Sequence, residues 1–327
     1  MIEYFLLFVL GLFVLIKSSD LFVVSASRLA KIFGVSELVI GLTVVAIGTS
    51  LPEFASSVIA SLNNDSGLAI GNIIGSNVAN IALILGVSAS LHTLKMEKKL
   101  FEKEAYILVG VTLLFYILAL DFVLSFSDGL LLVLLFFGYV FFMFRFKGQF
   151  QEVFKVNLYI ENILSFRKFV HLLQDNFKKV FIGETLVLII SLFGLFFGAS
   201  FVVDSAAKIA EFFSLTHAFV GLTLVALGTS LPELAVALIA LKKGFRDMLI
   251  GNLVGSNILN ILFVGGFAAL INPLIVSEFT LFVSGPFMVL VSFIFLVFVW
   301  NDLKLRRTEG IVLFLIYLLF LIVILPK

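Results

Sequence analysis

A succession of long apolar stretches constrains this chain more than any other feature. Hydrophobic residues make up 61% of its 327 residues and charged residues only 13%. Several stretches approach or exceed the roughly 20 apolar residues that a helix needs to cross a hydrocarbon layer of about 30 Å. Because they are continuously apolar and do not alternate over about 10 residues, they favour helices over a β-barrel. We therefore predict an integral membrane protein of the all-α class.

The hydropathy pattern predicts ten transmembrane helices. They lie near residues 3–30, 38–62, 68–91, 104–120, 128–145, 182–209, 218–241, 247–271, 279–299 and 309–325. The absence of cysteine excludes disulfide bonds and thiolate metal sites. No GxxxxGK[ST] nucleotide-binding loop occurs and no pattern indicates covalent catalysis. We expect neither an enzyme nor an ATP-driven pump, and neither a cofactor nor a nucleic-acid partner.

Lysine and arginine mark one face of the predicted bundle. They gather in four alternate connections, at residues 95–103, 145–179, 242–246 and 304–307. The connections on the other face contain none, and positive charge is concentrated in cytoplasmic loops. We therefore predict that both termini lie outside and that the 146–181 loop is cytoplasmic, as a linker or as an amphipathic helix on the membrane surface.

The chain contains an internal repeat. A shift of 180 residues aligns GLTVVAIGTSLPEFASSVIA, from Gly41, with GLTLVALGTSLPELAVALIA, from Gly221, and 14 of the 20 positions are identical. The same shift aligns IGNIIGSNVANI with IGNLVGSNILNI, from Ile70 and Ile250. We infer a first half at 1–145, the loop at 146–181 and a second half at 182–327. Five helices is an odd number, so the second half is inverted, as in many secondary transporters.

Each repeat places a proline and a glutamate inside an apolar stretch. Pro52 and Pro232 remove a helical hydrogen bond, so the second and seventh helices are expected to be broken, with the carbonyls of Gly48 and Gly228 freed. Polar backbone is tolerated at membrane depth only where it faces protein or a wet cavity. Carbonyl, hydroxyl and carboxylate oxygens together form the ligand set of Ca²⁺, Na⁺ or Mg²⁺.

Two stripes of polar residues face these broken helices. The spacing of four puts Asn72, Ser76 and Asn80 on one helix face, and Asn252, Ser256 and Asn260 on another. With the halves inverted, Glu53 and Glu233 converge on one central site. A protonated, hydrogen-bonded structural role is the alternative for both glutamates. The side chains of Asn72, Asn77, Asn252 and Asn257 suit helix–helix contacts as well as ion contacts, and Asp20 and Asp204 are interpreted as structural groups near helix ends.

The paired GTSLPE and GNxxGSNxxN motifs resemble the two alpha-repeats of the sodium/calcium exchangers, within the cation/calcium antiporter superfamily, in their prokaryotic form. The resemblance covers essentially the whole chain. It implies a Ca²⁺ extruder in the prokaryotic cell membrane, driven by Na⁺ influx, with alternating access around four central cation sites. The first and sixth helices would slide against the remaining bundle. It implies that a single chain is sufficient for transport, and the oligomeric state is left open.

The resemblance also implies a ligand set at the matching motif positions. It comprises the carboxylates of Glu53 and Glu233, the carbonyls of Ala46, Thr49, Ala226 and Thr229, and the hydroxyls of Ser50, Ser76, Ser230 and Ser256, with Asn80 and Asn260 beside them. Some archaeal and K⁺-dependent members have aspartate where this chain has Asn260, which argues against K⁺ co-transport. With two carboxylates, one Ca²⁺ neutralises the site and three Na⁺ leave it one charge positive, which is compatible with 3:1 exchange.

Two alternatives from other classes remain open. In an H⁺/Ca²⁺ exchanger the two glutamates would carry protons, although proton-coupled relatives more often have a GN-rich glutamate motif that is absent here. A cation channel could use the same inverted repeat, but it would pass ions without a counter-ion.

Overall fold

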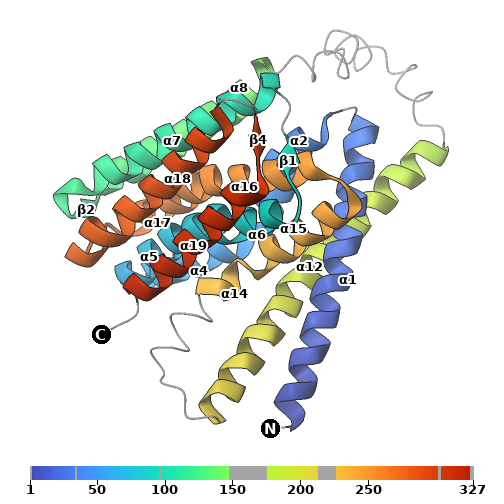
Figure 1. Ribbon diagram of the computed structural model, residues 1–327, viewed down its shortest axis with the longest axis horizontal. Helices are drawn as coiled ribbons and strands as arrows, with labels where there is room; N and C mark the ends of the chain where they lie inside the picture. The colour runs from blue at the N-terminus through green and yellow to red at the C-terminus, as the bar shows by residue number, and fades with distance from the viewer. Residues whose placement is uncertain are drawn as a thin grey trace.

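The computed structural model describes residues 2–33, 35–95, 98–146, 175–212, 226–300 and 303–324. The chain forms a bundle of helices against which two long helices, α1 and α12, lean together (Figure 1). In the first part the elements are α1 (Ile2–Phe33), α2 (Glu37–Ile40), η1 (Gly41–Val45), α3 (Ala46–Thr49), α4 (Leu51–Leu62), α5 (Ser66–Val78), η2 (Ala79–Leu85), α6 (Gly86–Leu91), β1 (Leu94–Lys95), α7 (Lys98–Leu118), η3 (Ala119–Asp121), β2 (Val123–Leu124) and α8 (Phe126–Phe146).

The second part repeats much of this order. It contains α12 (Asp175–Phe212), α14 (Ala226–Thr229), α15 (Leu231–Lys243), α16 (Arg246–Leu259), η5 (Asn260–Gly265), α17 (Gly266–Ile271), β3 (Leu274–Ile275), η6 (Thr280–Ser284), α18 (Gly285–Trp300), β4 (Lys304–Leu305) and α19 (Arg307–Ile324). The 146–181 loop falls largely on residues 147–174, outside the described part, and α12 already begins at Asp175.

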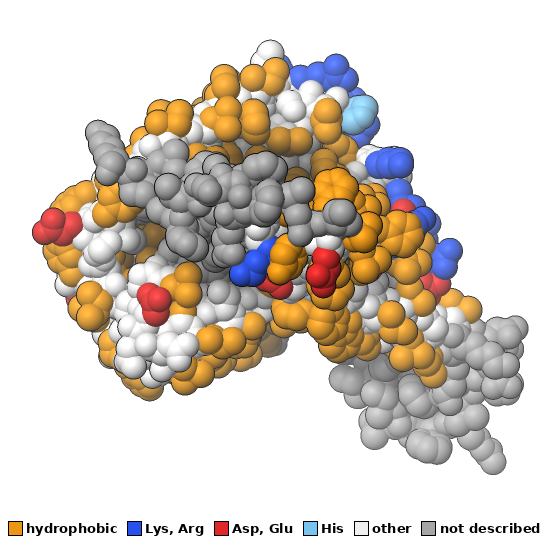
Figure 2. Space-filling model, turned by 90° about the horizontal axis from the view of Figure 1, so that it is seen from below, with side chains coloured by type: hydrophobic (Ala, Val, Ile, Leu, Met, Phe, Trp, Pro, Cys, Tyr) orange, Lys and Arg blue, Asp and Glu red, His pale blue; other side chains and the backbone are white. Residues whose placement is uncertain are grey.

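The described residues contain eight helices that are long and apolar enough to cross a membrane. They coincide with eight of the ten predicted helices. The second predicted helix is a bent pair, Glu37–Thr49 and Leu51–Leu62, with an angle of 44° between its parts. The seventh, predicted at 218–241, is described only from residue 226 onward. Large apolar side chains cover much of the described surface, while lysine and arginine gather mainly toward one edge (Figure 2), as expected for a membrane protein.

Both broken helices are interrupted at a serine three residues before the glutamate. Ser50 (φ −86°, ψ 5°) separates α3 from α4, and Ser230 (φ −88°, ψ 4°) separates α14 from α15. Each proline then occupies the first turn of the following helix, where its missing N–H costs no helical hydrogen bond. The break expected from the proline is therefore confirmed in both repeats.

Glycine allows the second helix to lie directly on α16. A Cβ atom at Gly41 would come within 2.5 Å of the Met248 carbonyl oxygen, and one at Gly251 within 2.5 Å of the Leu38 carbonyl oxygen. The two backbones are thus in contact, as small residues permit between membrane helices. This close approach brings α3 and its broken end alongside α16.

Short strands join the connections of the two parts. In one ribbon Leu94 pairs with Leu305 and Lys95 with Lys304, and in the other Val123 pairs with Ile275. The first ribbon joins two of the connections rich in lysine and arginine, and the second joins two that contain neither. This pairing agrees with the predicted division of the connections between two faces.

Candidate functional site

The two broken helices bring their glutamates to the centre of the bundle. Glu53, on the first turn of α4, is 1% exposed, and Glu233, on the first turn of α15, is 0% exposed. The two carboxylates are close enough to interact electrostatically. Glu233 also lies beside the hydroxyls of Thr49 and Ser50 on the opposite broken helix, although the geometry of a complete hydrogen bond is not reached.

Two hydrogen bonds cross between the repeats and correspond to each other under the shift of 180 residues. Thr49 Oγ1 donates to Asn252 Oδ1 at 3.1 Å, and Thr229 Oγ1 donates to Asn72 Oδ1 at 3.2 Å. Asn72 Nδ2 in turn donates to the Glu53 carbonyl oxygen at 3.0 Å and to Ser57 Oγ at 2.9 Å. The side chains of Asn72 and Asn252 therefore make helix–helix contacts, which the sequence analysis gave as one of two possible roles, the other being ion contact.

Wide helical turns surround the same centre. Asn80 lies in the π-helical segment η2, and Asn260 begins the π-helical segment η5. Such segments occur often at functional sites, because the extra residue in the turn alters where side chains and carbonyls point. Asn80 Nδ2 donates to Asn257 Oδ1 at 3.0 Å, and Asn257 Nδ2 donates to the Asn77 carbonyl oxygen at 3.2 Å. The polar stripes of α5–η2 and α16–η5 are thus joined across the repeat.

Most of the buried side-chain oxygen atoms without a protein partner in the described residues lie at this centre. Within the described residues, every side chain of the expected ligand set that offers a serine, glutamate or asparagine oxygen has such an atom. They are Ser50 Oγ, Glu53 Oε1 and Oε2, Ser76 Oγ, Asn80 Oδ1, Ser230 Oγ, Glu233 Oε1 and Oε2, Ser256 Oγ and Asn260 Oδ1. Leaving so many buried polar atoms unpaired would be costly. Hard cations, which take oxygen ligands, would satisfy them together.

The predicted carbonyl ligands lie at the same breaks. Ala46 and Thr49 begin and end α3, and Ala226 and Thr229 begin and end α14. The Ala46 carbonyl oxygen already accepts a hydrogen bond from the Ser50 N–H at 3.0 Å, which leaves its second lone pair. Thr49 is fully buried, whereas Thr229 is only partly buried.

Sequence reasoning missed one participant. Ser57 accepts from Asn72, but the corresponding residue in the second part is Ala237, and Asn252 Nδ2 has no partner among the described residues. The shift of 180 residues that aligned the repeats could have identified this difference. The described residues hold no group of three or more His, Cys, Asp or Glu side chains suited to a metal ion, so a cation at this centre would need hydroxyl, amide and carbonyl oxygens in addition to the two carboxylates.

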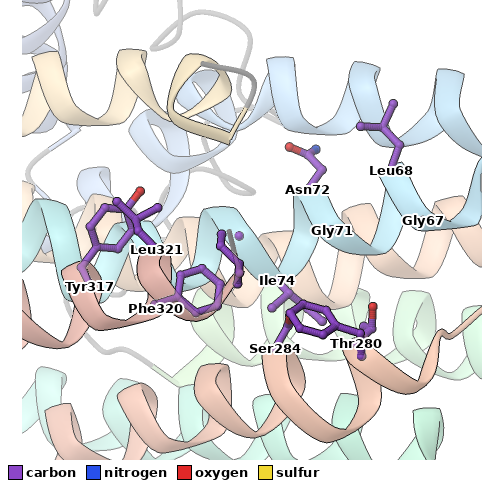
Figure 3. A pocket seen from close by; sticks show the side chains of 13 residues that line it. Gly67, Leu68, Gly71, Asn72, Ile74, Thr280, Ser284, Tyr317, Phe320 and Leu321 are labelled. Atoms are coloured by element: carbon purple, nitrogen blue, oxygen red, sulfur yellow. The ribbon is translucent and has the colours of Figure 1, made fainter. Parts of the chain in front are cut away.

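A cavity of about 280 Å³ lies on the other side of Asn72. Figure 3 shows Gly67, Gly71 and Asn72 along α5, with Tyr317 and Phe320 of α19 across the cavity. Gly67 and Gly71 have no side chains to fill this space, so the cavity extends along α5 to the Asn72 side chain. Asn72 therefore contacts both broken helices within the site and also lines this cavity.

Comparison with known proteins gives one consistent result. Residues 3–145 and 183–325 match the family described as sodium/calcium exchanger protein. The sodium/calcium exchanger MaX1 of Methanosarcina acetivorans is 38% identical over 98% of both chains. The inner membrane protein YrbG of Escherichia coli is 34% identical over 90% of this chain and 88% of its own. A solved structure of the sodium-calcium exchanger NCX_Mj superposes with a TM-score of 0.81 at 32% identity, covering 100% of each chain.

Proposed function

Because this chain belongs to the sodium/calcium exchanger family, we propose that it is a membrane antiporter that exchanges Na⁺ for Ca²⁺. The observation that carries the proposal is the set of buried, unpartnered oxygens around Glu53 and Glu233 in the described residues. Carboxylate and hydroxyl oxygens suit both ions, which lets Na⁺ and Ca²⁺ compete for shared ligands. Competition for one site is what couples the movement of one ion to that of the other.

The proposed ligands are those expected from the sequence. The carboxylates of Glu53 and Glu233 are shared between ions, and carbonyl and hydroxyl oxygens of both broken helices complete the coordination, with Asn80 and Asn260 at its edge. Two carboxylates balance one Ca²⁺, so three Na⁺ leave the site with one positive charge. We therefore propose a ratio of three Na⁺ to one Ca²⁺, which makes each exchange cycle electrogenic.

The proposed cycle is alternating access in a fold of ten helices. The halves at 1–145 and 182–327 form inverted five-helix repeats, joined by a cytoplasmic loop at 146–181, and both termini face outside. The pair α1 and α12 slides against the remaining bundle. Support comes from its packing, since α1 contacts α12 far more extensively than it contacts any other helix.

Uptake of ⁴⁵Ca²⁺ into proteoliposomes tests the proposal directly. Vesicles loaded with Na⁺ and diluted into Na⁺-free medium should accumulate Ca²⁺, while vesicles with equal Na⁺ on both sides should not. Uptake driven by a pH gradient alone would instead indicate an H⁺/Ca²⁺ exchanger. Uptake indifferent to both gradients would indicate a channel.

Replacement of either central carboxylate is expected to weaken Ca²⁺ exchange. Glu53→Gln or Glu233→Gln removes one negative charge, and losing a charged partner costs on the order of 1.5–3 kcal/mol, so the half-saturating Ca²⁺ concentration should rise at least about tenfold. Glu104→Gln is the matched control, because Glu104 is also buried but accepts a hydrogen bond from Tyr139 at 2.7 Å. Unchanged ⁴⁵Ca²⁺ uptake in both site variants would exclude this site.

A further inference from the structure

Two cavities meet the broken helices along α12, and they differ in chemistry. One, of about 330 Å³, lies between α4, α12 and the α14–α15 break. Its polar wall consists of Ser56, Ser200, Asp204 and Thr229, which we name the polar passage. The other, of about 520 Å³, has only apolar side chains and glycine in its wall, with Leu192, Phe193 and Phe196 on α12 and Leu51 and Phe54 on the opposite side.

The polar passage reaches the central site at the second broken helix. Its wall includes Thr229, which is partly buried and donates a hydrogen bond to Asn72. The corresponding Thr49 is 0% exposed. Beside it, a Cβ atom at Gly48 would lie 2.7 Å from the Leu192 side chain and 3.3 Å from the Phe22 ring. Among the described residues, the polar passage thus reaches the threonine of the second broken helix, whereas the threonine of the first is fully buried.

Asp204 lines the polar passage and has no acidic counterpart in the first half. The residue 180 positions earlier is Val24. Asp204 follows Ser200 by one helical turn, so the two side chains share the face of α12 that lines the cavity. The Ser200 hydroxyl donates to its own helix at the Phe196 carbonyl, at 3.0 Å, which leaves its oxygen lone pairs toward the passage. Asp204 has no ion-pair or hydrogen-bond partner in the described part of the chain.

We propose that Asp204 is a cation-recruiting residue, which together with Ser200 and Ser56 guides Na⁺ and Ca²⁺ through the polar passage to Thr229 and the central site. The inference rests on the proposed function and on its orientation, which puts this end of α12 outside. Asp204 is exposed and lines this cavity, and an acidic residue at the entrance to a site raises the local cation concentration and the rate of association without altering the final coordination. The wall of the apolar cavity offers a cation no side-chain oxygen.

The chain itself provides a clean probe of this passage, since it contains no cysteine. In Ser200→Cys the new thiol is the only one, and it should react from the outer face with membrane-impermeant methanethiosulfonates. A cationic and an anionic reagent are compared, and adding Asp204→Asn should lower the ratio of cationic to anionic rates by about tenfold, the low end of electrostatic steering. Leu192→Cys, in the apolar cavity, should react with neither reagent.

The matched control for a general surface effect is Glu278→Gln. Glu278 is exposed and belongs to a connection on the proposed outer face, but it does not line the passage. It should leave the reagent ratio at Ser200→Cys unchanged. The inference is overturned if Asp204→Asn has no effect on that ratio, if Glu278→Gln has the same effect, or if Leu192→Cys reacts as fast as Ser200→Cys. This readout requires no transport, so it remains decisive even if Na⁺/Ca²⁺ exchange is not observed.

The transport assay then measures the consequence. At low ionic strength, Asp204→Asn should raise the half-saturating external Ca²⁺ concentration about tenfold and leave the maximal rate unchanged. The difference should shrink as choline chloride is added, because the Debye length falls from about 30 Å at 0.01 M to about 10 Å at 0.1 M. Asp204→Glu should restore the wild-type value. A fall in the maximal rate alone would assign Asp204 a structural role and overturn the proposal.

Discussion

At the scale of single residues, the two halves are alike in their proposed ligands but not in the hydrogen bonds around them. Asn72 has acceptors for its amide group in the Glu53 carbonyl and in Ser57, whereas the position equivalent to Ser57 in the second half is Ala237 and Asn252 keeps an unpartnered Nδ2 within the described residues. A buried donor without an acceptor costs about 1–3 kcal/mol. The second half of the site is therefore the less rigidly held of the two.

We expect Ser57→Ala to destabilise the folded protein by about 1 kcal/mol, because Asn72 then loses one of its two acceptors. Thermal unfolding in detergent measures the change. Ser292→Ala is the control, since the Ser292 hydroxyl is equally buried but donates only to the Met288 carbonyl of its own helix. Equal stability losses in both variants would show that the hydrogen bond from Asn72 to Ser57 contributes no more to stability than a hydroxyl bonded within its own helix.

The sequence predicted which side chains gather at the centre of the bundle better than it predicted their contacts. Glu53 and Glu233 could be identified because a carboxylate next to a proline has few explanations inside an apolar stretch. The bonds between Thr49 and Asn252 and between Thr229 and Asn72 could not, since partners separated by 203 and 157 residues depend on how whole helices pack. The role of Ser57 required the same tertiary information.

At the scale of elements, the contact of the second helix with α16 determines where the first broken end lies. Gly41 and Gly251 allow backbone against backbone, and Thr49 reaches Asn252 one residue beyond Gly251. The break itself was predictable, since proline has a local effect. The π-helical segments η1, η2, η5 and η6 were not, because the i→i+5 hydrogen bonds that define them leave no strong local sequence pattern.

Gly251→Ala is expected to separate α16 from the second helix. The added Cβ would lie 2.5 Å from the Leu38 carbonyl oxygen, and overpacking of this kind typically costs about 1–3 kcal/mol. Both the midpoint of thermal unfolding and the rate of Na⁺-dependent Ca²⁺ uptake should fall. Gly110→Ala serves as the control, because no atom lies within 4 Å of the corresponding position on α7. A variant as stable and as active as the wild type would contradict the close contact.

At the scale of the whole molecule, a compact bundle carries the paired helices α1 and α12 on one side (Figure 1). Arg28 and Glu184 form an ion pair within the α1–α12 pair at 2.7 Å, while Lys243 of α15 reaches Asp20 of α1 at 2.8 Å. Hydropathy predicted the apolar helices, and the charge pattern divided the connections between two faces. Neither indicated that α1 and α12 are neighbours, because lipid-facing and protein-facing apolar residues are the same in type.

Orientation in the membrane gives a prediction at this scale. In the cysteine-free chain, Asn63→Cys should react with an impermeant maleimide added to intact cells, because its connection carries no lysine or arginine. Lys95→Cys should react only after the membrane is permeabilised. Both positions are exposed in the structure, so accessibility of the side chain does not differ between them. The opposite labelling pattern would reverse the proposed topology.

The two threonine–asparagine bonds described above have a consequence for how such a chain can change over generations. Each threonine depends on an asparagine encoded in the other half of the gene, so a substitution at position 49 is compensated at position 252 and not at its own duplicate, 229. The two copies are therefore inherited as complementary parts. A half-length gene product would keep one carboxylate but lose the partner that holds its broken helix in place, and selection acts on the pair.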